Sequence, residues 1–472
     1  MMSTATARIL SFALFCAVAA VAAPPTWDRF RGPNGTGVDD SSALPATLDP
    51  AKNAVWKTVL PNGYSSPVLN KDSIFLTAFE GDKLLTICLN RATGKIAWKR
   101  EAPRDRLTKI DKRNSPASPS PVLDGNSVYV FFGDYGLVSY GLDGNEKWRT
   151  PLGPFNNVYG IGASPVLAGN SLVLIVDQNI GSFAAGFDKR TGKLKWRKDR
   201  PEALSGASTP AVYNNKYVIA PASFRVDTYD ADTGEIVWFA RGLASEMKSV
   251  PVVVGDRVLI SGYNTPENEP GKQMKLPEWA DVIANFDKDK DGMISKEESP
   301  NEQTRRYFQF EDIDENGKLD AKEWKLFQMV LGAENGLLAF KLTGAKGDIT
   351  ESGLLWKYHK AVPQLPTLVA YKGIVYMVND AGVLNTIELA TGKGLKTARV
   401  RGAADSYYAS IIAGDNKVYF FARSGKITVL EAGAEQKELS ASELDAEIFA
   451  TPAIAEGKIY VRTTNALYCF GS

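Results

Sequence analysis

The sequence predicts an all-β protein, an eight-bladed β-propeller built from four-stranded antiparallel blades. Two observations lead to this fold class. An apolar strand, a turn built on Thr-Gly or Gly, and a strand that often holds Trp recur along the chain. In most repeats a small residue followed by Pro opens the unit, ahead of a hairpin turn containing Gly or Asn. Repeats of roughly 40 to 50 residues with short strands and tight turns are typical of propeller blades.

The spacing of the repeats predicts where one blade is interrupted. The turn motif is clearest in LNRATGKIAW, FDKRTGKLKW and YDADTGEIVW, which end at Trp98, Trp196 and Trp238. Successive units begin 41 to 54 residues apart, except that 115 residues separate the fifth start from the sixth. The fifth blade therefore contains an insertion. The eight starts are Pro67, Pro121, Pro165, Pro210, Pro251, Pro366, Ile411 and Pro452.

The last repeat lacks its outermost strand, because the chain ends at Ser472 soon after the third strand. The segment NAVWKTVL, residues 53–60, has the Trp-bearing pattern of an outer strand but precedes the first blade. We expect this segment to pair with the last blade, since that pairing closes the ring and removes an exposed strand edge.

The chain divides into four parts. Residues 1–22 carry one charge, Arg8, before an apolar run that ends in small residues, a pattern typical of a secretory signal peptide. Residues 23–263 are expected to form blades one to four and half of blade five, 264–334 the insertion, and 335–472 the remainder. No later segment has the length of a membrane span. We therefore expect a secreted protein, located in the periplasm.

Charge and cysteine content narrow the kinds of partner. The formal net charge is +1, and it falls to zero without Arg8, so no global field favours nucleic acid or an anionic membrane. His359 is the only histidine, which excludes a His-rich zinc site. Cys88 and Cys469 fall on third strands of neighbouring blades, where we expect two buried thiols and no disulfide. Calcium, a small ligand or another protein remain as partners of an expected monomer.

Two acidic loops in the insertion have the spacing of EF-hand calcium loops. DKDKDGMISKEE and DIDENGKLDAKE each place oxygen donors at alternating positions, Gly at position six and Glu at position twelve. The alternative is an ordinary solvated acidic surface. We expect two structural Ca²⁺ sites whose loops pair through Ile294 and Leu319. The predicted ligands are Asp287, Asp289, Asp291, Met293 (carbonyl), Ser295 (through water) and Glu298, then Asp312, Asp314, Asn316, Lys318 (carbonyl), Asp320 and Glu323.

Loops between blades supply four further candidates on the face that carries the insertion. Arg113, Tyr159, Lys248 and His359 follow outer strands or precede inner strands, and these connections emerge on one side of a propeller. They are candidates for a ligand pocket at the propeller mouth, although solvated loop residues would give the same pattern. No arrangement of residues predicts a catalytic site.

The TGKxxW turns and SPV starts resemble the quinoprotein-like propeller repeats. The segment WDRFRGPNGTG, Trp27 to Gly37, is similar to the start of periplasmic PQQ-like propeller proteins of planctomycetes. The resemblance implies one of two functions: a non-enzymatic scaffold of the BamB type, or a dehydrogenase that uses pyrroloquinoline quinone (PQQ). The dehydrogenase is the alternative that is not favoured, because the chain has no Cys-Cys pair for the vicinal disulfide on which the alcohol-oxidising members stack the quinone. We expect a calcium-binding scaffold whose cap is ordered by calcium.

Overall fold

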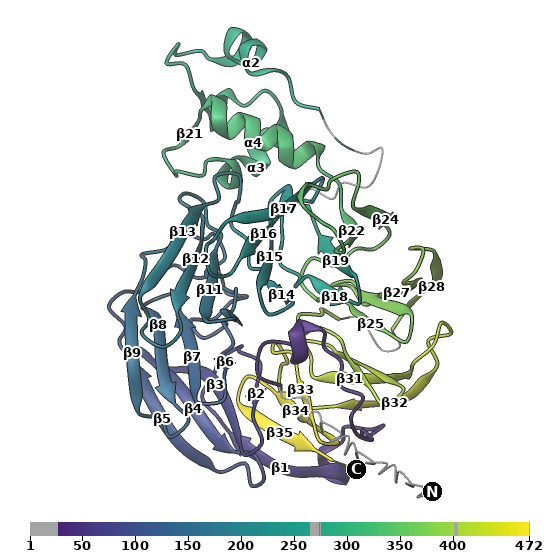
Figure 1. The fold of residues 1–472 in the computed structure, drawn as a ribbon. Helices are drawn as coiled ribbons and strands as arrows, with labels where there is room; N and C mark the ends of the chain where they lie inside the picture. Colours follow the sequence, from purple (N-terminus) through teal and green to yellow (C-terminus); the bar gives the residue numbers. More distant parts are fainter. Residues whose placement is uncertain (1–26, 265–272, 274, 401–404, 472) are drawn as a thin grey trace, which may run out of the picture.

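The structure is a computed structural model that describes residues 27–264, 273, 275–400 and 405–471. Eight antiparallel sheets stand around a central channel, and the ribbon follows them in chain order around the ring (Figure 1). The predicted eight-bladed propeller is confirmed. The predicted signal peptide, residues 1–22, lies outside the described residues. None of the described helices combines the length and apolar character needed to cross a membrane.

Each of the first four blades runs from a short inner strand to a Trp-bearing outer strand. Their strands are β2 (Val68–Leu69), β3 (Ser73–Glu80), β4 (Lys83–Asn90), β5 (Ile96–Ala102); β6 (Val122–Leu123), β7 (Ser127–Phe132), β8 (Gly136–Gly141), β9 (Glu146–Pro151); β10 (Val166–Ala168), β11 (Ser171–Val176), β12 (Phe183–Asp188), β13 (Leu194–Asp199); and β14 (Ala211–Tyr213), β15 (Tyr217–Ala222), β16 (Arg225–Asp230), β17 (Ile236–Arg241).

The remaining blades follow the same order, and the last takes its outer strand from the other end of the chain. Their strands are β18 (Val252–Val254), β19 (Arg257–Gly262), β22 (Gly336–Lys341), β24 (Leu354–Tyr358); β25 (Val369–Tyr371), β26 (Ile374–Val378), β27 (Val383–Glu388), β28 (Gly394–Arg399); β29 (Ile412–Gly414), β30 (Lys417–Phe421), β31 (Lys426–Glu431), β32 (Glu438–Glu443); and β33 (Ala453–Ala455), β34 (Lys458–Arg462), β35 (Ala466–Phe470), β1 (Ala54–Val59).

The N-terminal strand closes the ring as predicted. β1 pairs antiparallel with β35, with Lys57 opposite Tyr468 and Val59 opposite Ala466. A helical turn, α1 (Pro50–Asn53), leads into the strand. The first and last strands of the described chain therefore lie in one blade, and none of the eight blades lacks an outer strand.

The recurring Gly and Trp make the contact between successive blades. Gly144 has φ +83°, and a Cβ atom there would lie 2.8 Å from the ring of Trp98 in the preceding blade. The Trp98 indole N–H donates to the carbonyl of Leu142 in the same turn, at 3.0 Å. Glycine is required both for the left-handed backbone and for the close approach of the ring. The same contact joins Trp56 to Gly94, Trp148 to Gly192, Trp196 to Gly234 and Trp356 to Gly392.

The turn of blade five differs, and blade four gains a strand from it. The connection from β22 to β24 is longer than in other blades, and within it β23 (Gly347–Asp348) runs parallel to β17, with Gly347 opposite Trp238. A four-stranded blade was predicted here. The longer turn adds the fifth strand because it extends across Trp238 where other blades place a tight Gly turn.

The small residue before each inner strand explains the Ser-Pro and Thr-Pro starts. Around the channel, the backbone N–H at this position donates to the hydroxyl of the equivalent residue in the next blade, at 2.9 to 3.0 Å. Only Val250 lacks a hydroxyl, which leaves the ring of hydrogen bonds open at one link. The hydroxyl residues are Ser66, Ser120, Ser164, Thr209, Thr367, Ser410 and Thr451.

The segment around the short helix η1 (Pro33–Gly35) closes one end of the channel (Figure 1). The Trp27 carbonyl accepts a hydrogen bond from the backbone N–H of Leu69, at the end of the first inner strand, at 2.8 Å. On the other side of the ring, the buried Arg31 guanidinium donates to the carbonyls of Leu368 at 2.7 Å and Ile411 at 3.0 Å. Leu69 ends its inner strand, whereas Leu368 and Ile411 directly precede theirs, so the segment reaches along the channel. The end of the channel where the inner strands begin is here called the mouth.

The insertion leaves the ring between β19 and β22 and stands above it (Figure 1). Its elements are α2 (Trp279–Phe286), β20 (Ile294–Ser295), the 3-10 helix η2 (Lys296–Glu298), α3 (Glu302–Glu311), β21 (Lys318–Leu319) and α4 (Ala321–Gly332). The expected pairing of Ile294 with Leu319 is observed in the antiparallel bridge of β20 and β21. Both side chains are buried in a core of the insertion's own, with Val282, Phe308, Trp324, Phe327 and Leu331.

Candidate metal loops and mouth pockets

The two acidic loops have the same internal hydrogen bonds, although their sequences differ. The carboxylate at position twelve accepts from the backbone N–H groups at positions two and nine. For Glu298 these donors are Lys288 at 2.8 Å and Ser295 at 2.9 Å. For Glu323 they are Ile313 at 2.8 Å and Asp320 at 3.0 Å. The final Glu of each loop is therefore held over its start by the backbone.

The glycine at position six makes the sharp turn in each loop. Gly292 and Gly317 have φ of +81° and +85°, in the left-handed region that glycine adopts without strain. Their N–H groups donate to the carboxylates at position one, Asp287 at 3.0 Å and Asp312 at 2.8 Å. Each loop is thereby folded back so that its acids face a common centre.

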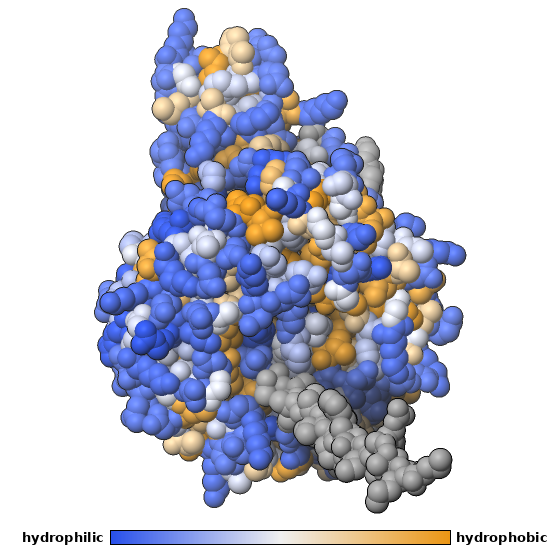
Figure 2. All heavy atoms as spheres, viewed as in Figure 1, coloured by the Kyte–Doolittle hydropathy of each residue, from blue (hydrophilic) through white to orange (hydrophobic). Residues whose placement is uncertain are grey.

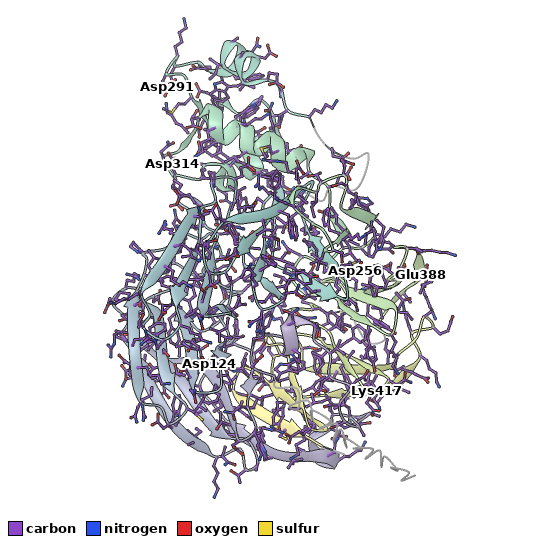
Figure 3. All side chains as sticks on the ribbon, viewed as in Figure 1. Asp124, Asp256, Asp291, Asp314, Glu388 and Lys417 are labelled. Atoms are coloured by element: carbon purple, nitrogen blue, oxygen red, sulfur yellow. The ribbon has the colours of Figure 1, made fainter. Side chains whose placement is uncertain are left out.

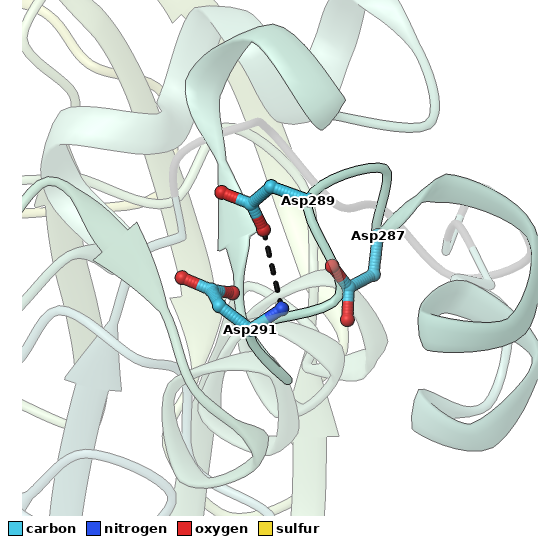
Figure 4. Close-up of side chains that lie close together, drawn as sticks. All are labelled: Asp287, Asp289 and Asp291. Atoms are coloured by element: carbon cyan, nitrogen blue, oxygen red, sulfur yellow. Dashed lines mark hydrogen bonds between the residues drawn. The ribbon is translucent and has the colours of Figure 1, made fainter.

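The carboxylates gather as a hard cation requires. In the first loop, oxygens of Asp287, Asp289 and Asp291 lie within 4.8 Å of one another, as do oxygens of Asp312, Asp314 and Glu323 in the second. Figure 4 shows the first group, with the Asp291 N–H donating to Asp289 at 3.2 Å. One Asp287 oxygen is buried without a hydrogen-bond partner in the described structure. Oxygen donors in this number suit Ca²⁺.

The other predicted ligands lie in the same loops. The Ser295 hydroxyl donates to Glu298 at 2.7 Å, and the Asp320 carboxylate caps α4 by accepting from Lys322 and Glu323 at 2.8 Å. Asn316 accepts from the Lys318 N–H at 2.8 Å, and Met293 makes the equivalent bond to Asp291 at 2.9 Å. Met293 and Lys318 therefore occupy matching positions.

The two loops differ in their surroundings. The Lys318 ammonium of the second loop pairs with Asp289 at 3.1 Å and with Asp291 of the first. These pairs raise the pKa of Lys318, and the bond from Lys318 lowers the pKa of Asp291. Figure 3 places Asp291 and Asp314 along one edge of the insertion. The ammonium group of a lysine from the second loop therefore lies beside the carboxylates of the first loop.

The second loop lies against the propeller. Ile313, at position two of the loop, packs with Leu326 and Val330 of α4 against Phe224, which lies in the hairpin between β15 and β16. All four side chains are buried, and Leu204 of the preceding blade packs beside them. Figure 2 shows hydrophobic side chains gathered where the insertion meets the ring. Burial also raises the pKa of Glu323.

Three of the four mouth candidates come together. Arg113 and Lys248 lie over the ring of Tyr159, at 5.4 Å and 4.5 Å from its centroid. They line one pocket with Gln364, Tyr408 and other residues of the blade connections. Burial raises the pKa of Tyr159 to about 12. His359 lies elsewhere: its Nδ1 is 2.9 Å from the Asn335 carbonyl, near the start of β22.

The two cations in the mouth pocket are paired with acids. The Arg113 guanidinium donates to Asp111 at 2.7 Å, and the Lys248 ammonium donates to Glu246. The mouth therefore carries cations above an aromatic ring without an uncompensated positive charge on either residue.

A second pocket, here named the junction pocket, lies between the insertion and the mouth. Sequence reasoning missed it because its walls come from distant segments that carry no shared motif. The buried Glu311, at the end of α3, lines this pocket, and burial followed by the charge of Glu323 raises its pKa to about 8. The lining residues are Val158, Tyr159, Asn179, Leu204, Ser205, Ser245, Glu246, Tyr307, Phe310, Glu311, Ile313 and Val330.

Part of the sequence matches a known family model. The family described as outer membrane protein assembly factor BamB matches residues 87–288. The curated protein of that name from Francisella salina is 26% identical to this chain over 155 residues, and the match covers 31% of this chain and 28% of the relative. The protein from Shewanella oneidensis is 26% identical over 218 residues, with 45% and 51% covered. The matched region thus spans about half or less of the length of these relatives.

Solved structures resemble the chain over most of its length. BamB from Moraxella catarrhalis superposes with a TM-score of 0.56 at 12% identity, with 88% of this chain and 98% of that chain covered. Quinohemoprotein alcohol dehydrogenase from Comamonas testosteroni gives 0.57 at 11% identity, with 96% and 82% covered. At such identities the likeness shows the fold alone.

Proposed function

We propose that this eight-bladed propeller is a calcium-binding scaffold of the cell envelope, with a mouth face that binds another protein. Two Ca²⁺ ions, one in each acidic loop, would hold the insertion as an ordered cap. The propeller supplies the rigid ring, and the cap supplies a surface whose order depends on the metal. The envelope location follows the name of the BamB relatives, an outer membrane assembly factor.

One observation carries the proposal: the second loop is part of the contact between cap and propeller. Ile313 stands between Asp312 and Asp314, both predicted ligands, and its side chain is buried against Phe224. A cation that fixes the backbone of this loop therefore also fixes a side chain on the mouth face. Binding to the ordered state alone stabilises it by about 2.7 kcal/mol at a calcium concentration 100 times Kd.

The residues present fit Ca²⁺ in each loop. The ligands would be the predicted carboxylates and Asn316, with the carbonyls of Met293 and Lys318. The bound ion would supply positive charge that neutralises the gathered acids. The backbone of each loop orients the final ligand, since its N–H groups donate to the carboxylates of Glu298 and Glu323. Secreted calcium modules have weak sites, with Kd of roughly 10⁻⁴ to 10⁻³ M, so the sites would be filled outside the cell.

The test is partner capture with and without calcium. The purified chain, immobilised, is exposed to the solubilised envelope fraction of its own organism in calcium or in chelator. We expect one or more proteins to be retained in calcium and released by chelation, and Glu323→Gln to lose them. A chain that retains no protein, yet oxidises alcohols or sugars when PQQ is added, would overturn the scaffold proposal.

The alternative, a PQQ-dependent dehydrogenase, has weaker support in the mouth. The described residues do not fit the quinone well, because its three carboxylates would meet Arg113 and Lys248, which are already paired with acids. The thiols of Cys88 and Cys469 are buried on different blades, so they offer no stacking disulfide. A titration with PQQ and calcium, followed by quinone absorbance and dye reduction, decides between the two functions.

A further inference from the structure

The junction pocket is lined by acidic residues and by no basic residue. Only two of its lining residues are charged, Glu246 and Glu311, and both are acids. Glu246 is paired with Lys248 and accepts a hydrogen bond from Gln364 at 2.9 Å. Glu311 is only 6% exposed, and its carboxyl group has neither a hydrogen bond nor an ion pair within the part of the chain that the structure describes. Burial without a partner favours the neutral form of such a carboxyl group, and a basic group bound beside it would stabilise the charged form.

The walls of the pocket suit the stem of an organic cation. Three aromatic residues, Tyr159, Tyr307 and Phe310, line it, and aromatic faces attract ammonium and guanidinium groups. Leu204 and Val330 add aliphatic surface against which a chain of methylene groups can pack. An inorganic cation would make no use of these apolar walls.

The rim extends the apolar surface beyond the pocket. Phe310 is 44% exposed, and Ile180, which follows the pocket-lining Asn179 in sequence, is 50% exposed. Exposed apolar side chains beside a pocket are typical of a protein-binding site. A free amine would leave them in water, whereas residues that flank a basic side chain in a polypeptide would cover them.

We propose that the junction pocket receives a lysine or arginine side chain of a partner polypeptide, with Glu311 as its counter-charge and apolar neighbours against Phe310 and Ile180. This inference rests on the proposed function and names the chemistry of the partner. Because the pocket has walls from both α3 and the propeller, the site is complete only when the cap is docked.

The experiment uses the full chain, saturated with calcium and immobilised. The probe is a pool of short N-acetylated peptides with arginine or lysine at the centre and leucine, phenylalanine, alanine or serine around it. A matched pool has norleucine at the centre. We expect the basic pool to be enriched over the norleucine pool. A single enriched peptide, resynthesised, should bind Glu311→Gln about tenfold more weakly than the natural chain and should also lose affinity for Phe310→Ala.

Control variants distinguish a loss of peptide binding at the pocket from misfolding of the cap or loss of calcium. Glu302→Gln removes an exposed acid from the same helix and should bind the peptide like the natural chain. Calcium titration of Glu311→Gln should still report both sites, which shows that the cap is intact. No enrichment of the basic pool, or equal binding by Glu311→Gln, would overturn the inference. So would agmatine, a guanidinium on a short apolar stem, competing as tightly as the peptide, since the site would then serve small amines.

Failure of this inference and failure of the proposed function give different results. If an envelope protein is captured in a calcium-dependent way but Glu311→Gln captures it equally well, the scaffold stands and the pocket is not its docking site. If the peptides bind through Glu311 but no envelope protein is captured, the pocket stands and the scaffold proposal falls.

Discussion

The two acidic loops of the insertion fold alike but face different surroundings. In both, the backbone binds the final glutamate and a left-handed glycine turns the chain. The first loop has Lys318 beside its acids, whereas the second presents Ile313 to the propeller. The second loop is therefore placed to transmit order to the mouth, whereas a cation within the cap competes for the acids of the first loop.

The largest expected effect comes from removing the final glutamate of either loop. Glu298→Gln and Glu323→Gln each replace a ligand that would bind through two oxygens, so we expect one site of two to weaken by about 100-fold or more. Isothermal titration with calcium should report one site of unchanged affinity in each variant. If two unchanged sites remain in either variant, the metal assignment is wrong.

Substitutions at the contact between cap and ring should have the next largest effect. Ile313→Ala removes buried methyl groups at the propeller surface, which costs about 2 to 5 kcal/mol where the side chain is fully buried. We expect faster hydrogen exchange in α4, and a similar result for Phe224→Ala. Leu355→Ala, on an exposed part of an outer strand, is the control and should leave α4 unchanged. Equal exchange in all three variants would mean that the contact does not hold the cap.

The first loop should bind calcium more tightly without Lys318. Lys318→Met removes a charge that pairs with Asp289 and Asp291 but keeps the backbone carbonyl predicted as a ligand of the second loop. Exposed ion pairs are weak, so we expect a gain of about threefold to tenfold at the first site. Titration of Lys322→Met, which removes an exposed lysine nearby, should show no gain. A loss of affinity in Lys318→Met would contradict this competition.

Calcium removal should affect the ring least. The blades are held by the Trp and Gly contacts and by the ring of hydroxyls, none of which includes an acidic loop. Chelation should therefore leave the main thermal unfolding transition within a few degrees, while the cap becomes accessible to limited proteolysis. A large fall in the main transition would show that the ring itself depends on the metal.

The sequence predicted the fold best where a residue makes the same local contact in each repeat. The Gly and Trp of each turn predicted the blades because the contact repeats, and the pattern of residues 53–60 predicted the closing strand. The hydroxyl ring and β23 were not predicted, since each depends on which blade is the neighbour. Arg113, Tyr159 and Lys248 were predicted to share the mouth. The junction pocket was not, because Glu246 and Glu311 meet only through the docking of the cap.

Hydrogen exchange with and without calcium would show whether the second loop couples calcium binding to the mouth. The segments to follow are α4 and the hairpin that contains Phe224. We expect calcium to slow exchange in both segments in the natural chain and in Glu298→Gln, but not in Glu323→Gln. Calcium-independent exchange at this contact in the natural chain, or full protection in Glu323→Gln, would contradict it.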